Sequence, residues 1–107
     1  MIALIEDNRE AIVELCERYG VRRLAVFGSA AKGTFDPATS DIDLVVDYLD
    51  WGPGIFHRFF GFIEALEHLL GYHVDMTTEP ATKQWLRDEL ARTQVTLYES
   101  ASSQSAA

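Results

Sequence analysis

The sequence predicts a small α/β (α+β) domain in which helices flank a mixed sheet of three to four strands. Short apolar segments of strand length alternate along the chain with longer segments in which apolar residues recur at helical spacing. Glycine and proline separate most of these segments. The chain has 107 residues, of which 48% are hydrophobic, so it can bury one core. We therefore expect one domain over residues 1–99 and a disordered tail over residues 100–107.

The first half of the chain predicts a helix, a strand, a short helix and a second strand. Apolar side chains recur at helical spacing over residues 5–19, and Gly20 follows where a helix commonly ends. Residues 22–27 form a short apolar run of strand length. A glycine and a serine stop this run, and residues 28–32 can begin a short helix directly after it. The next apolar run, over residues 41–47, predicts the second strand.

The second half predicts another helix–strand repeat and one further helix. Residues 55–70 form the strongest helical pattern in the chain, and residues 72–77 read as the third strand. Pro80 suits the first turn of a last helix, whose apolar side chains include Trp85. Residues 95–98 are apolar enough to add a strand at the edge of the sheet.

The helix expected over residues 55–70 carries more apolar surface than one face of a small sheet needs. Its main apolar face comprises Phe56, Phe59, Phe60, Ile63, Leu66 and Leu70. Phe62 and Leu69 extend the apolar surface further around the helix. We therefore expect a second buried surface on this helix, formed with another copy of the chain or with a partner protein.

Charge and composition exclude several classes of function. The formal net charge is -8 with only nine basic residues, so direct nucleic-acid binding is not expected. The single cysteine, Cys16, allows no internal disulfide and shares the helical spacing of a core residue. No apolar run reaches the ~20 residues of a membrane span. The N-terminal residues lack the basic region of a secretory signal, so we expect a cytoplasmic protein without membrane contact.

The chemistry-bearing motif is Gly28-Ser29, followed after eleven residues by Asp41-Ile42-Asp43. Residues two apart in a strand point to the same face, so Asp41 and Asp43 are expected side by side. Two adjacent carboxylates repel each other unless a cation lies between them. Their hard oxygen atoms suit Mg²⁺, which commonly binds one or two carboxylates together with substrate phosphates.

The Gly28-Ser29 pair is a candidate phosphate site. A helix that begins here presents free backbone N–H groups to an anion, and Gly28 allows close approach while Ser29 adds a hydroxyl donor. Lys32 completes the candidate nucleotide-binding residues, and Ser40 is expected to orient Asp41 by a hydrogen bond. Taken alone, the pair is also compatible with an ordinary turn and a capping serine.

This motif resembles the signature of the DNA polymerase β-like nucleotidyltransferase superfamily. The short length is similar to its smallest branch, the minimal nucleotidyltransferases that pair with HEPN-domain proteins in bacteria and archaea. The resemblance covers roughly residues 21–75. The loop before Asp41 is one residue longer than is usual in the family, and Ala30 stands where the family often has arginine. The family takes a third carboxylate from a neighbouring strand, and Asp75 matches that position.

The resemblance implies transfer of a nucleoside monophosphate, AMP from ATP, to a hydroxyl group. Asp41 and Asp43 would hold two Mg²⁺ ions, and Asp75 would complete the metal and catalytic set. For the minimal branch the acceptor implied is a tyrosine of a HEPN toxin, which makes this chain its antitoxin. Two alternatives stay open: a non-catalytic module that masks its partner by contact, and a transferase acting on a small-molecule hydroxyl. Enzymes of the latter kind usually carry a further helical domain.

Overall fold

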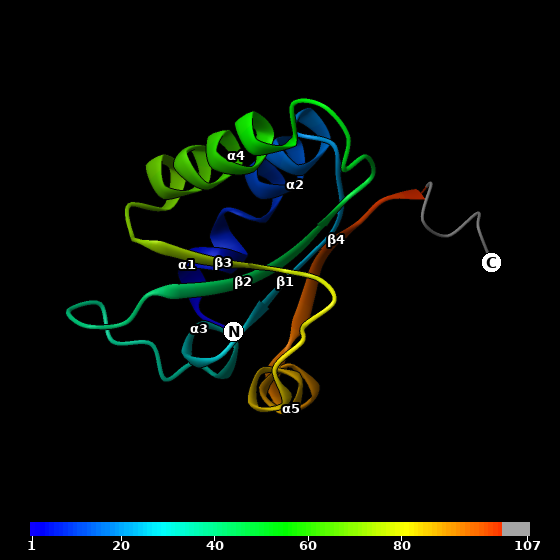
Figure 1. Ribbon diagram of the computed structural model, residues 1–107. Coiled ribbons are helices and arrows are strands. Elements are labelled where there is room, and N and C mark those ends of the chain that lie inside the picture. Colours follow the sequence, from blue (N-terminus) through cyan, green and yellow to red (C-terminus); the bar gives the residue numbers. More distant parts are fainter. Residues whose placement is uncertain (102–107) are drawn as a thin grey trace.

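The computed structural model describes residues 1–101 and contains a four-stranded mixed sheet (Figure 1). The strands are β1 (Val21–Phe27), β2 (Ile42–Tyr48), β3 (Val74–Thr78) and β4 (Val95–Glu99), in the spatial order β3-β2-β1-β4. β1 pairs antiparallel with both β2 and β4, whereas β2 and β3 run parallel. The predicted mixed sheet is therefore confirmed, and the apolar segment near the C-terminus is its fourth strand.

Helices cover both faces of this sheet. They are α1 (Ala3–Asp7), α2 (Arg9–Arg18), α3 (Ser29–Lys32), α4 (Ile55–Leu70) and α5 (Gln84–Thr93). α2 and α4 lie side by side on one face, and α5 lies on the other (Figure 1). α3 follows β1 directly at one end of the sheet, so the loop between β1 and β2 begins there.

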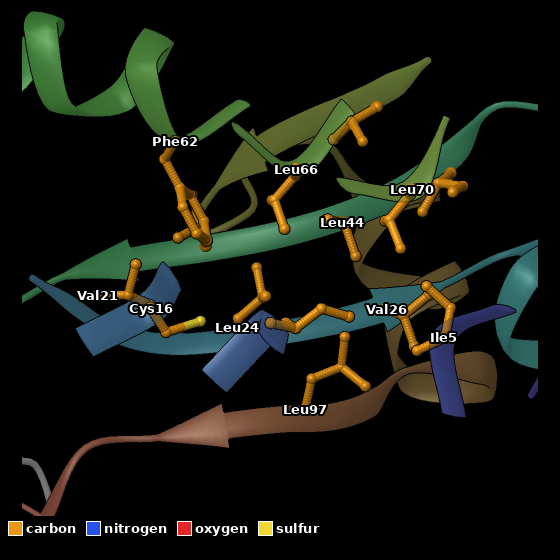
Figure 2. Close-up of a cluster of buried hydrophobic side chains, with 14 of the residues drawn as sticks. Ile5, Cys16, Val21, Leu24, Val26, Leu44, Phe62, Leu66, Leu70 and Leu97 are labelled. Atoms are coloured by element: carbon orange, nitrogen blue, oxygen red, sulfur yellow. The ribbon is translucent and has the colours of Figure 1, made fainter. Parts of the chain in front are cut away.

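The main core fills the space between the sheet and α1, α2 and α4. Alternate residues of the strands, such as Leu24 and Leu44, point to this side. They meet Phe62 and Leu66 of α4, with Cys16 of α2 close by (Figure 2). Cys16 is fully buried, which confirms that this cysteine is a core residue, and its burial raises the pKa of the thiol to about 12.

A smaller core lies on the opposite face. The intervening strand residues Ala25, Phe27 and Val45 pack there against Leu86 and Leu90 of α5. The same face carries the odd-numbered carboxylates of β2 and β3, because side chains alternate along a strand. α5 thus shares its side of the sheet with the candidate catalytic residues.

Two predictions about the N-terminal and C-terminal segments need correction. The helix expected over residues 5–19 is interrupted at Asn8, whose side-chain amide donates to the Leu4 carbonyl oxygen at 2.9 Å. At the other end, Ser100 is buried and its amide donates to the Arg22 carbonyl oxygen at 2.8 Å. The remainder of the expected tail, residues 102–107, lies outside the described residues.

The buried face of α4 differs from the predicted one. Phe62 and Leu66 are fully buried, whereas Phe56 and Phe60 are 77% and 63% exposed. The apolar arc of this helix is wider than the sheet surface that it covers, so one edge of the arc faces solvent. The predicted surplus of apolar surface therefore consists of Phe56 and Phe60, and Phe62 belongs to the core.

The last helix begins later than Pro80. The Glu79 amide donates to the Val46 carbonyl oxygen at 2.9 Å, so the extended chain continues past β3 and α5 starts only at Gln84. Trp85, one of the apolar side chains of this helix, is 65% exposed. Within residues 1–101, every helix is too short or too polar to cross a bilayer.

Candidate active site

The site is built where the end of β1 touches the start of β2. Gly28 has a φ of +69°, and a Cβ atom added to it would lie only 2.8 Å from an Asp43 carboxylate oxygen. A side chain at this position would therefore strain the backbone and collide with Asp43. Because Gly28 has no side chain, the Asp43 carboxylate can lie directly against the backbone of the candidate phosphate turn.

Asp43 and Asp75 are paired across neighbouring strands. They are Cα partners in the parallel register of β2 and β3, so their side chains emerge on the same face. Burial raises the pKa of Asp43 to about 6, and the charges of Asp75, Asp41 and Glu89 add to the rise. The structure thus brings together the two carboxylates that the sequence placed on different strands, and the charged form of Asp43 is disfavoured there.

Asp41 lies just before β2 and faces a different neighbour. One of its carboxylate oxygens is 3.4 Å from Nδ1 of His73, and Nε2 of that imidazole is 3.9 Å from a Glu67 carboxylate oxygen. No group of three or more acidic, His or Cys side chains within residues 1–101 is arranged to hold a metal ion. Asp41 therefore shares the neighbourhood of Asp43, but the carboxylates do not converge on one point.

The phosphate turn is fastened to α5 by a residue that the sequence analysis missed. The Gly28 amide donates to the Thr93 hydroxyl at 3.0 Å, and that hydroxyl donates to the Glu89 carbonyl oxygen at 2.9 Å. The Gly28 amide is therefore engaged within the protein, and Ser29 is left as the polar side chain of the turn. The 65-residue separation between Gly28 and Thr93 explains why no local sequence pattern predicts this contact.

Glu89 is the second residue that the sequence analysis missed. Its carboxylate lies 3.7 Å from the Lys32 ammonium and 2.6 Å from the Arg92 guanidinium. Lys32 is half-exposed, so its flexible side chain can still reach an anion at the turn. Glu89 therefore links the predicted nucleotide-binding lysine to the carboxylate group that includes Asp43.

Ser40 does not contact Asp41 as predicted. Its hydroxyl oxygen accepts a hydrogen bond from the Asp36 amide at 3.0 Å, and its own amide donates to the Asp36 carbonyl oxygen at 2.8 Å. Asp36 is an exposed turn-former in the loop, and its side chain also accepts from the Ala38 amide at 2.9 Å. Ser40 thus shapes the loop that leads to Asp41.

Arg87 of α5 lies away from the site. Arg87 donates to the Gln84 side chain at 2.8 Å and lines a cavity of about 410 Å³ on the flank of α5 that also carries Gln94. Gln94 accepts a hydrogen bond from Arg23 at 3.0 Å. The flank with Arg87 therefore faces the start of β1, and the opposite flank, with Glu89, faces the carboxylates.

Comparison with known proteins gives matches at the level of sequence and of structure. A family model described as a nucleotidyltransferase domain matches residues 9–96. The protein adenylyltransferase MntA of Thermococcus cleftensis is 37% identical over 79 residues, which cover 74% of this chain and 77% of that protein.

Two solved structures are similar over most of the chain. One, described as a proposed minimal nucleotidyltransferase, has a TM-score of 0.71 at 33% identity, and the match covers 88% of this chain and 95% of the other. A second comes from the complex of a tri-AMPylated Shewanella oneidensis HEPN toxin with its MNT antitoxin. It has a TM-score of 0.62 at 18% identity and covers 94% of this chain and 76% of the other. At that identity the second likeness shows the fold alone.

Proposed function

Since the chain belongs to the nucleotidyltransferase domain family, we propose that it transfers AMP from ATP to a hydroxyl group of a partner protein. The observation that carries this proposal is the contact between the phosphate turn and the carboxylates: Gly28 abuts Asp43, and Asp43 is paired with Asp75. The similar protein from Thermococcus cleftensis is itself named a protein adenylyltransferase, which supports AMP as the transferred group.

Mg²⁺ fits the donor set of this site. Asp41, Asp43 and Asp75 offer only carboxylate oxygens, which are the ligands that Mg²⁺ prefers. The raised pKa of Asp43 reflects burial and like charge, and a divalent cation would relieve both. Without a cation between them, neighbouring carboxylates repel one another. When bound, two Mg²⁺ ions would neutralise charge on the attacking and leaving oxygens.

The proposed transfer step gives these residues of the candidate site distinct roles. Ser29 and Lys32 would hold the β- and γ-phosphates, because both lie in the turn and short helix beside Asp43. The acceptor hydroxyl oxygen forms a bond to the α-phosphorus, and the bond to the bridging oxygen breaks so that pyrophosphate leaves with the electron pair. Asp75, which is exposed on its strand, takes the proton of the hydroxyl group.

We assign the acceptor to a tyrosine of a HEPN-type toxin, which the transfer would silence. The related fold in complex with a tri-AMPylated HEPN toxin supports this class of partner. The net charge of -8 favours a partner with a basic surface. The exposed Phe56 and Phe60 are also compatible with a second candidate, an antitoxin that masks its partner by contact without transferring a nucleotide.

Asp75→Asn separates these two functions. The substitution keeps the size and polarity of the side chain but removes the charge that would bind the ion and accept the proton. We expect labelled AMP transfer from ATP to the partner to fall by about 100-fold or more, while partner binding is retained. Asp50→Asn is the control, because Asp50 is an exposed aspartate just beyond the far end of β2. If Asp75→Asn silences the toxin as well as wild type does, masking by contact replaces catalysis.

A further inference from the structure

The flank of α5 that faces the carboxylates also carries an exposed tryptophan. Glu89 marks this flank through its 3.7 Å contact with Lys32 and its influence on the pKa of Asp43. Trp85 precedes Glu89 by four residues, so the two side chains occupy the same face of the helix, about 6 Å apart along its axis. Trp85 thus lies one helical turn from the charged end of the site, on the side of the sheet that holds Asp43 and Asp75.

The packing of the fold does not explain why a tryptophan stands exposed at position 85. The indole is 65% exposed although the next residue, Leu86, is buried against the sheet. No ring contact or hydrogen bond joins the Trp85 side chain to any other residue in the part of the chain that the structure describes. The anchoring of α5 to the phosphate turn through Thr93 fixes the distance between this indole and the turn. The helix that carries the tryptophan is therefore anchored beside the site, and the aromatic surface of the indole is available to a ligand.

We propose that Trp85 is the platform on which the base of the nucleotide stacks. The inference rests on the proposed function, because it takes the triphosphate to lie at Ser29 and Lys32. From there the ribose and base extend away from the phosphates, and Trp85 lies about 6 Å, one helical turn, beyond Glu89, which contacts Lys32. A base offers a flat π-surface to an indole, and such stacking strengthens binding without selecting strongly between bases. The purine is thus held by α5, and the phosphates by α3.

Tryptophan fluorescence tests the platform directly. The chain has two tryptophans, so Trp51→Phe leaves Trp85 as the single reporter. In the presence of Mg²⁺, ATP should quench this emission, whereas inorganic tripolyphosphate should compete with ATP but leave the emission unchanged. Trp85→Ala should weaken ATP binding by about 5- to 100-fold and leave tripolyphosphate binding unaltered, and Trp85→Phe should retain most of the ATP affinity.

The outcomes separate this inference from the proposed function. If Trp85→Ala binds ATP as tightly as wild type does, the platform is refuted while the nucleotidyltransferase proposal stands. Equal losses of ATP and tripolyphosphate affinity in Trp85→Ala would also refute it, since the effect would then lie in the fold of α5. A wild type that binds neither ligand, measured by calorimetry, overturns the proposed function and the platform together.

Discussion

At Asp43, folding favours the protonated carboxyl group, whereas the proposed reaction needs the charged carboxylate. Its carboxylate is partly buried against Gly28 and paired with Asp75, so folding disfavours its charge. Catalysis by a cation-dependent transferase requires that same charge. This is the usual pattern of a functional site, in which groups that destabilise the free protein become favourable once the ligand arrives.

The pKa of Asp43 gives a stability prediction with a definite sign. Its value rises from 3.8 to about 6 on folding, so the folded state binds the proton more tightly. At acid pH this carboxyl group therefore does not lower the free energy of unfolding. As the pH rises through about 4 to 6, it lowers that free energy progressively. Asp43→Asn should accordingly stabilise the metal-free protein by on the order of 1 kcal/mol at pH 7.5, after allowance for solvent screening.

Urea unfolding in EDTA measures this difference at pH 7.5 and again near pH 3.5. Near pH 3.5 the gain should largely disappear, because wild-type Asp43 is mostly protonated in both states. The same variant should lose AMP transfer. A variant that is less stable than wild type at pH 7.5 would show that the Asp43 carboxylate supports the fold, contrary to the electrostatic argument.

At the scale of the elements, α5 connects the second core to the reaction site. Leu86 and Leu90 seat the helix on the sheet, and Thr93 ties its last turn to Gly28. The helix thus carries Glu89 and Trp85 at a fixed distance from the phosphate turn. Motion of α5 relative to β1 would displace every one of these groups at once.

Thr93→Val tests this anchor. Valine has the shape of threonine but leaves the partly buried Gly28 amide without its acceptor, so we expect a loss of about 1–3 kcal/mol in the free energy of unfolding. ATP affinity should fall as well, because α5 would be held less firmly beside the turn. Thr93→Ser retains the hydroxyl and serves as the matched control in urea unfolding and in calorimetry with ATP. Equal stability of the valine and serine variants would mean that the hydrogen bond contributes nothing.

The elements also show which parts of the fold local patterns can predict. Strand alternation predicted only that Asp41 and Asp43 share a face, and the position of Asp75 came from the family resemblance; in the structure Asp75 is the register partner of Asp43. Helical period located α4 and most of its buried face, but an apolar arc wider than the sheet leaves the choice between Phe60 and Phe62 to packing. The contact of Thr93 with Gly28 depends on tertiary structure alone, and no pattern within either segment indicates it.

At the scale of the whole molecule, the site and the most apolar surface lie apart. We define the aromatic patch as Trp51, Phe56 and Phe60, which line a hollow of about 250 Å³ near the end of β2. All three side chains are between 47% and 77% exposed. Asp43 lies near the start of that strand, so about 16 Å of β2 separates it from Tyr48 beside the patch. A partner that uses both regions must be larger than a short peptide.

The aromatic patch should bind the partner protein and contribute little to the fold. Phe56→Ser combined with Phe60→Ser should weaken association with the proposed HEPN-type partner by about tenfold or more. The free energy of unfolding should change by less than about 0.5 kcal/mol, because both rings face solvent. His57→Ser is the matched control, since His57 is exposed on another side of the same helix. Calorimetry measures the association, and sedimentation of the chain alone reports any homodimer. A wild type that remains monomeric and does not bind the HEPN-type partner would contradict the prediction, as would unchanged binding by the double variant.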